Sequence, residues 1–153
     1  MQWIDDYALG IQEIDDQHRK LLEAFSSIER AITAQSSWSE IHFLIIHLKG
    51  LAKSHFEFEE ALMRLFAYKE TAEHKGFHEQ FLTTLTDVER TSIQAPEEGD
   101  LCRRLGDWFR NHMFICDRGY VEHIRAGAPL VMLASSKHEL PVSGAAKVGL
   151  ARS

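Results

Sequence analysis

The sequence predicts an all-α protein, an antiparallel up-down-up-down four-helix bundle with an N-terminal arm and a C-terminal tail. Four long segments carry apolar residues at helical spacing, and no segment alternates in the way a strand does. Short turns that contain Ser, Gly or Pro separate these segments, as expected for neighbouring antiparallel helices. Five histidines and two carboxylates fall on the apolar stripes, where a core residue is expected.

The first helix is expected from about residue 12 to 35, where His18 fills a gap in the apolar stripe. That stripe consists of Ile14, Leu21, Phe25, Ile28 and Ile32. The second helix is expected from about 39 to 66, with Ser37 or Ser39 placed to cap its start. Its stripe consists of Ile41, Leu44, Leu48, Leu51, Phe58, Leu62 and Phe66, and it also carries His55 and Glu59.

The third helix is expected from about 71 to 92, with Thr71 as a candidate cap. One of its faces carries His74, Phe77, His78, Phe81, Leu85 and Val88. The fourth helix is expected to begin near Pro96, a residue suited to a first helical turn, and to stop at Gly119. Its stripe consists of Leu101, Leu105, Trp108, His112 and Ile115.

One bundle domain is expected over residues 1–125, since 153 residues can bury one core but not two comfortable ones. The first 11 residues are interpreted as an arm, and a short helical turn from Tyr120 to Arg125 is expected after the bundle. From Ala126 the composition shifts to Ala, Gly, Ser and Pro, which predicts a flexible tail over 126–153.

Composition and charge exclude several functional classes. A net charge of -6 without a basic cluster argues against nucleic acid as a partner. No apolar run approaches the roughly 20 residues that a membrane span requires. The beginning of the chain has no secretory signal pattern, so a cytoplasmic location is expected. The protein is expected to be a monomer that could bind an unidentified protein partner.

The two cysteines, Cys102 and Cys116, fall on the same predicted helix about 21 Å apart along its axis. This separation is too long for a disulfide within one chain, so both are expected to be reduced. Cys116 is interpreted as a small core residue, with a redox-sensing thiol as the alternative.

The seven polar residues on the stripes predict a pair of metal ions. They are His18, His55, Glu59, His74, His78, His112 and Asp117. Imidazole and carboxylate are suitable ligands for first-row divalent metals, and residues four apart on a helix can point at one centre. Burying this many polar groups without metal would cost roughly 1 to 3 kcal/mol for each unsatisfied group. The four other histidines, His42, His47, His123 and His138, are expected on the surface.

Asp117 fits this arrangement only if the fourth helix is distorted. It follows His112 by five residues and would point about 140° away on a regular helix. A single-turn bulge, of the kind that occurs at functional sites, would bring it to the same centre.

Counting ligands predicts one open coordination position. If Glu59, Asp117 and a hydroxide bridge two ions, each ion receives three ligands from the bridges. Five histidines then divide three and two, which leaves one ion six-coordinate and the other five-coordinate. The open position could accept a small neutral molecule.

Four segments together resemble the bacterial hemerythrins over about residues 1–122. They are Gly10 to His18, which ends Ile-Asp-Asp-Gln-His; His55-Phe56-Glu57-Phe58-Glu59-Glu60; the pair His74 and His78; and Trp108 to Asp117. The resemblance implies two iron ions with a bridging hydroxide or oxide, and reversible binding of dioxygen. It also implies His74, His78 and His112 on the closed iron, with His18 and His55 on the open one.

The expected function is therefore that of an oxygen carrier, store or delivery protein. An oxygen or redox sensor acting through a partner is one alternative. A di-iron enzyme of the peroxidase, nitric oxide reductase or iron oxidase type is another, although no catalytic acid or base is evident beyond the ligands. Phe56, Phe81 and Trp108 are expected to wall the site and to exclude water.

Overall fold

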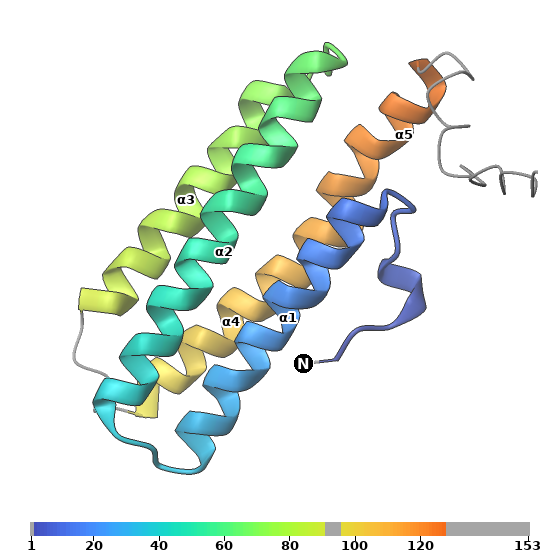
Figure 1. The fold of residues 1–153 in the computed structure, drawn as a ribbon. Coiled ribbons are helices and arrows are strands. Elements are labelled where there is room, and N and C mark those ends of the chain that lie inside the picture. The colour runs from blue at the N-terminus through green and yellow to red at the C-terminus, as the bar shows by residue number, and fades with distance from the viewer. Residues whose placement is uncertain (1, 91–95, 128–153) are drawn as a thin grey trace, which may run out of the picture.

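A computed structural model of the chain describes residues 2–90 and 96–127, and all regular secondary structure in these ranges is helical. The elements are η1 (Asp5–Tyr7), α1 (Gln12–Thr33), α2 (Trp38–Leu65), α3 (Thr71–Arg90), α4 (Pro96–His112), η2 (Met113–Asp117) and α5 (Arg118–Gly127). The predicted all-α class is confirmed. In Figure 1, α1 and α3 descend, whereas α2 and the rod formed by α4, η2 and α5 ascend. The predicted tail lies, from residue 128, outside the described residues, as does His138.

The first residues of α2 and α4 agree with the sequence prediction, whereas the predicted cap of α3 does not. Ser37 forms a capping box, because its hydroxyl accepts from the Glu40 backbone N–H and the Glu40 carboxylate accepts from the Ser37 N–H. Helix α4 begins at Pro96, as predicted. The predicted cap at Thr71 is wrong, since Thr71 is already helical and its hydroxyl donates to the Tyr68 carbonyl at 2.6 Å.

Two buried clusters of apolar side chains form the core. The larger one joins α1, α2, α3 and α4 and includes Phe56 and Phe109. The smaller one joins the residues before α1 to the end of α2 and to α5, and it includes Tyr120. Both clusters touch the same group of buried polar side chains, so these polar residues lie between the two clusters.

The N-terminal arm is attached to α1 and to α5. The Asp15 carboxylate accepts hydrogen bonds from the backbone N–H groups of Leu9 at 2.7 Å and Gly10 at 2.9 Å. The Arg125 guanidinium donates to the Leu9 carbonyl, which ties the same turn to α5. Gly10 has a φ of 76°, a left-handed conformation that glycine adopts without strain.

Two predictions for the fourth helix are wrong. Gly119 does not end the helix, because α5 continues to Gly127. A Cβ added at Gly119 would lie 3.0 Å from the Tyr68 hydroxyl oxygen, so this position is closely packed. Ile115 is 68% exposed instead of lying in the stripe. The five-residue turn of η2 contains one more residue than an α-helical turn and rotates the following residues about the axis.

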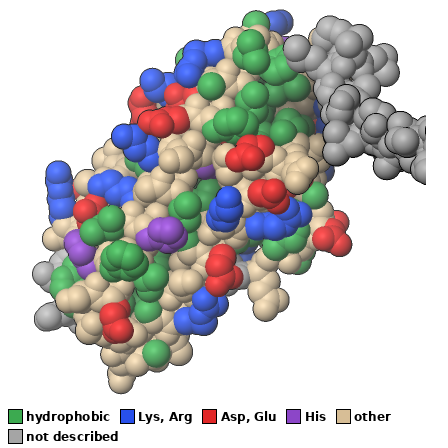
Figure 2. Space-filling model, viewed as in Figure 1, with side chains coloured by type: hydrophobic (Ala, Val, Ile, Leu, Met, Phe, Trp, Pro, Cys, Tyr) green, Lys and Arg blue, Asp and Glu red, His purple; other side chains and the backbone are tan. Residues whose placement is uncertain are grey.

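The surface carries charges of both signs. Figure 2 shows Lys and Arg interspersed with Asp and Glu across the face in view. Within the described ranges, no helix has both the length and the apolar character that crossing a membrane requires.

Candidate metal centre

The structure brings all seven predicted residues together in one buried cluster. Helix α1 contributes His18, α2 contributes His55 and Glu59, α3 contributes His74 and His78, and the last helical rod contributes His112 and Asp117. Each of these side chains belongs to a buried residue. Helix α2 therefore supplies one carboxylate and η2 the other.

Glu59 lies between two groups of histidines. Its Oε1 atom faces His55 Nε2 at 3.5 Å and His18 Nε2 at 3.9 Å. Its Oε2 atom faces His78 Nε2 at 3.3 Å and His74 Nε2 at 3.9 Å. The two oxygens thus point at different groups, as a bridging carboxylate requires.

Asp117 repeats this arrangement. Its Oδ1 atom lies 3.2 Å from both His74 Nε2 and His112 Nε2. Its Oδ2 atom lies 3.3 Å from His18 Nε2. Both carboxylates therefore face the same two groups of nitrogens, Glu59 from α2 and Asp117 from η2.

Helical distortion is what places Asp117 in the cluster. The segment Met113–Asp117 is a π-helix, and Met113 and Asp117 are its buried residues. A π turn accommodates the five-residue spacing from His112 that a regular helix would direct away from the centre. The predicted single-turn bulge is confirmed.

The ligand atoms divide into two overlapping sets. One comprises Glu59, His74, His78, His112 and Asp117, and the other comprises His18, His55, Glu59 and Asp117. Within each set the atoms lie within 4.8 Å of one another. Three histidines stand on one side and two on the other, with the carboxylates common to both, as the ligand count predicts.

Spacing and burial both fit metal ions. His112 Nε2 lies 3.1 Å from His74 Nε2 and from His78 Nε2. Two nitrogens at right angles about 2.1 Å from one ion lie about 3.0 Å apart. Several buried atoms also have no hydrogen-bond partner among the described residues: His18 Nε2, His55 Nε2, Glu59 Oε2 and both Asp117 oxygens. Cations would satisfy these atoms.

Burial favours the neutral form, which binds metal, in three of the cluster imidazoles, those of His55, His78 and His112. It lowers the pKa of His78 and of His112 to about 4, and neighbouring histidines add to the effect. Burial also lowers the pKa of His55 well below its usual range, and His18 lowers it further. For His74, burial acts in the same direction but is outweighed by Asp117, which raises the pKa.

Without cations the two carboxyl groups do not ionise equally. Burial, followed by repulsion from Asp117, raises the pKa of Glu59 to about 8. Burial opposes ionisation of Asp117 as well, but His112 and His18 hold its pKa well below its usual range. Positive ions at the cluster would stabilise both carboxylates in the ionised form.

Sequence reasoning missed Tyr120. The ring is fully buried, and its hydroxyl donates to Glu59 Oε1 at 2.7 Å. Tyr120 was expected in a separate helical turn after the bundle. Its spacing of three residues after Asp117 was an available signal, because residues three apart share a helix face.

Aromatic rings surround the histidines. Phe56 stacks on His78 with centroids 3.9 Å apart, and Trp108 stacks on His112 at 4.7 Å. Phe81 stacks in turn on Trp108 at 5.0 Å. The three predicted wall residues therefore adjoin the three-histidine side.

Phe109 forms the wall on the other side and was also missed. Its ring meets His18 edge-on at 5.9 Å and His55 at 6.1 Å. Phe109 is fully buried and also packs against Phe25. This ring therefore covers the two-histidine side, where an open coordination position is expected.

The remaining polar residues differ partly from expectation. Cys102 and Cys116 form no disulfide with each other, as predicted, and burial raises the pKa of the half-buried Cys116 thiol, which disfavours the reactive thiolate. His47 is exposed, whereas His42 is half-buried. His123 is half-buried too and its Nε2 lies 2.9 Å from the Phe66 carbonyl, so a surface position was wrong for both.

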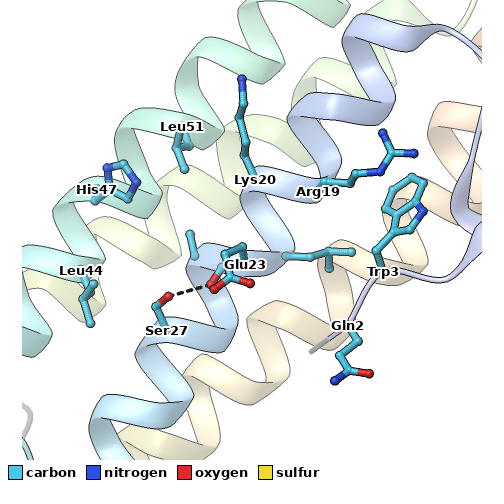
Figure 3. Close-up of a pocket in the computed structure, with 11 residues that line it drawn as sticks. Gln2, Trp3, Arg19, Lys20, Glu23, Ser27, Leu44, His47 and Leu51 are labelled. Carbon is cyan, nitrogen blue, oxygen red and sulfur yellow. Dashed lines mark hydrogen bonds between the residues drawn. The ribbon is translucent and has the colours of Figure 1, made fainter.

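A groove of about 640 Å³ lies away from the cluster, between the arm, α1 and α2. Figure 3 shows Trp3 and Arg19 at one end and Leu44 and His47 at the other. The Arg19 guanidinium lies 4.3 Å from the centroid of the Trp3 ring. None of the seven cluster residues is among those that line this groove.

The chain is similar in sequence to a known protein family and to several of its members. The Hemerythrin HHE cation binding domain matches residues 9–124. The chain is 36% identical over 125 residues to the bacteriohemerythrin of Pseudomonas aeruginosa strain LESB58, covering 80% of each chain. It is 27% identical over 126 residues to the bacteriohemerythrin of Clostridium acetobutylicum, covering 78% of this chain and 98% of that protein.

A less similar relative is a myohemerythrin. The myohemerythrin of Theromyzon tessulatum is 22% identical over 112 residues, which cover 73% of this chain and 83% of that protein. The domain match over residues 9–124 spans the helices that build the buried cluster. The chain therefore belongs to the hemerythrin family, whose members bind dioxygen at a di-iron centre.

Proposed function

We propose that this chain binds dioxygen reversibly at two iron ions and acts as an oxygen carrier, store or delivery protein. The observation that carries this proposal is the position of Glu59 and Asp117, whose oxygens face both sets of histidines. Ligands of this type and number suit a pair of first-row metal ions. The proposed domain covers residues 1–125 and is the antiparallel up-down-up-down bundle expected from the sequence.

Each of the seven residues has a proposed role. His74, His78 and His112 would hold one iron, and His18 and His55 the other. Glu59, Asp117 and a hydroxide or oxide would bridge the two. When bound, the iron pair supplies the electrons by which dioxygen is taken up and released.

Side chains of this protein control what reaches the centre. Phe109 packs on the two-histidine side and excludes water from His18 and His55. The stacked rings of Phe56 and Trp108 cover the three-histidine side. A dry environment favours reversible binding over irreversible oxidation, because water and protons are kept from the iron.

Tyr120 orients the bridging carboxylate. Its hydroxyl donates to Glu59 Oε1, the oxygen that faces the two-histidine side. The hydrogen bond fixes this oxygen and places a proton next to the side on which an open position is expected. Because both residues are fully buried, water does not compete for this bond.

Oxygen cycling of the purified protein tests the proposal. We expect two irons per chain and a visible absorption band that appears with oxygen and disappears under vacuum over repeated cycles. A single zinc ion, or no metal, would contradict the di-iron centre. Rapid one-way oxidation would contradict the carrier role and favour the enzyme or the sensor.

Matched histidine variants sharpen this test. His55 and His47 lie on the same helix, one buried in the cluster and the other exposed. We expect His55→Ala to lose the oxygen-dependent band and His47→Ala to retain it. Equal loss in both variants would contradict the assignment of the site.

A further inference from the structure

The outward nitrogens of the cluster histidines meet different acceptors. His78 Nδ1 lies 3.3 Å from Glu60 Oε1, whereas His55 Nδ1 lies 3.0 Å from Gln17 Oε1. His18 Nδ1 is buried and has no hydrogen-bond partner among the described residues. The three-histidine side therefore has a carboxylate behind one ligand, whereas the two-histidine side has an amide and an unpartnered nitrogen.

Contacts farther out orient both acceptors. The Gln17 amide nitrogen donates to Glu13 Oε1 at 2.8 Å, which turns the amide oxygen toward His55. Glu60 uses its other oxygen, Oε2, to face Arg64 Nη1 at 3.6 Å. Glu60 is only 15% exposed at its side chain, whereas Arg64 is 60% exposed. A chain of contacts thus leads from surface Arg64 through Glu60 to His78.

These two acceptors act differently on a ligand imidazole. When Nε2 of a neutral histidine binds metal, its Nδ1 carries the proton and donates it. A carboxylate acceptor pulls this proton more strongly than an amide does, because the hydrogen bond is charge-assisted. The imidazole then becomes more basic and stabilises the more highly charged metal ion.

We propose that Glu60 is a positioning residue that, through His78, favours the ferric state of the iron on the three-histidine side, and that Arg64 moderates its effect. The inference rests on the proposed function. The neutral Gln17 gives the iron on the other side no equivalent stabilisation. The iron on the closed side is consequently the better electron donor of the two.

The midpoint potential of the iron-loaded protein, measured by spectroelectrochemistry without oxygen, tests this inference. In Glu60→Gln we expect the ferric preference to fall about tenfold, the lower end of the effect of such outer hydrogen bonds on metal sites. For a two-electron couple, tenfold corresponds to a potential about 30 mV higher.

The neighbouring ion pair on α2 provides matched controls. Lys53 and Glu57 have the same four-residue spacing as Glu60 and Arg64, lie 4.0 Å apart, and both are largely exposed. Glu57→Gln changes the same charge on the same helix without touching a cluster histidine. An equal shift in Glu57→Gln and Glu60→Gln would overturn the proposal, as would a lower potential in Glu60→Gln.

A second pair keeps the test decisive if Glu60→Gln fails to load iron. Arg64→Ala removes the cation beside Glu60 and should lower the potential by more than Lys53→Ala does. Equal shifts in the midpoint potential of Arg64→Ala and Lys53→Ala would show that Arg64 does not act through Glu60, and would overturn the proposal. If the wild-type protein cycles with oxygen while Glu60→Gln leaves its potential unchanged, only the inference fails. A wild-type protein that holds no iron overturns the proposed function itself.

Discussion

The hydroxyl of Tyr120 donates a 2.7 Å hydrogen bond to Oε1 of Glu59, and both side chains are fully buried. Glu59 reaches the cluster from α2 and Tyr120 from α5, so the bond joins two helices across the centre. It also supports the oxygen that faces His18 and His55. The Glu59 carboxylate is therefore held by the smaller core cluster as well as by its own helix.

Replacing Tyr120 by Phe should weaken iron binding as well as folding. Burial raises the pKa of Glu59 to about 8 in the absence of metal, so at pH 7 the lost bond is one to a neutral carboxyl group. That loss should cost about 1 kcal/mol, against about 2 kcal/mol when metal keeps Glu59 ionised. The difference corresponds to roughly fivefold weaker binding. Urea unfolding of the metal-free protein measures the loss of folding stability, and comparison with the iron-loaded protein measures the loss of iron affinity.

Tyr68→Phe is the matched control for this change. The Tyr68 ring packs edge-on against the Tyr120 ring at 6.4 Å, but its hydroxyl lies beside Gly119 and Glu70. We expect unchanged iron affinity in Tyr68→Phe. Equal affinities in Tyr120→Phe and the wild type would show that the bond does not support the centre.

Phe109→Leu should shorten the lifetime of the oxygenated protein. The smaller side chain opens space beside His18 and His55, and water entering there promotes irreversible oxidation. We expect autoxidation to be severalfold faster and the free energy of unfolding to fall by roughly 1 kcal/mol. The decay of the visible band in air measures the lifetime. Phe114→Leu, at a position 48% exposed, should change neither quantity, and equal decay in both variants would refute the role of Phe109.

The sequence was sufficient to predict the four helices and the seven cluster residues, because periodicity marks a buried face. A histidine such as His18 in an apolar stripe is conspicuous, since the alternatives at that position are hydrocarbon side chains. Phe109, by comparison, is one apolar residue among others on its helix, so nothing marked it out as part of the site. It lies four residues after Leu105 and three before His112, but the neighbouring Trp108 fits the same stripe, and a period of 3.6 permits either.

The fourth helix shows where periodicity fails. The five residues from His112 to Asp117 predicted a distortion, and η2 provides it. Which residues are buried after His112 depends on how far the π turn rotates the chain, and residue spacing does not reveal that rotation. Extending the stripe through η2 with a regular period placed Ile115 inside, whereas it is exposed. It also left Tyr120 outside the bundle, whereas its ring is fully buried and its hydroxyl bonds to Glu59.

Removing the metal should destabilise the folded protein substantially. Chelation would leave the seven cluster residues buried, several with atoms that have no partner among the described residues. At a free metal concentration 100 times the Kd, binding stabilises the native state by about 2.7 kcal/mol, which corresponds to a Tm roughly 10 °C higher. Calorimetry of the iron-loaded and chelated proteins tests this. His55→Ala, which binds less metal, should show a smaller difference, and an identical Tm in both states of the wild type would contradict the prediction.

Gly10→Ala and Gly50→Ala should change stability in opposite directions. Gly10 has a φ of 76°, and a Cβ there would meet the Arg125 guanidinium that donates to the Leu9 carbonyl. The left-handed conformation alone costs an alanine about 1 to 2 kcal/mol. Gly50 lies within α2 with nothing within 4 Å of its added Cβ, so alanine should stabilise the helix there by about 0.5 to 1 kcal/mol. Urea unfolding of the iron-loaded proteins measures both changes, and a stabilising Gly10→Ala would show that the arm is not held in this turn.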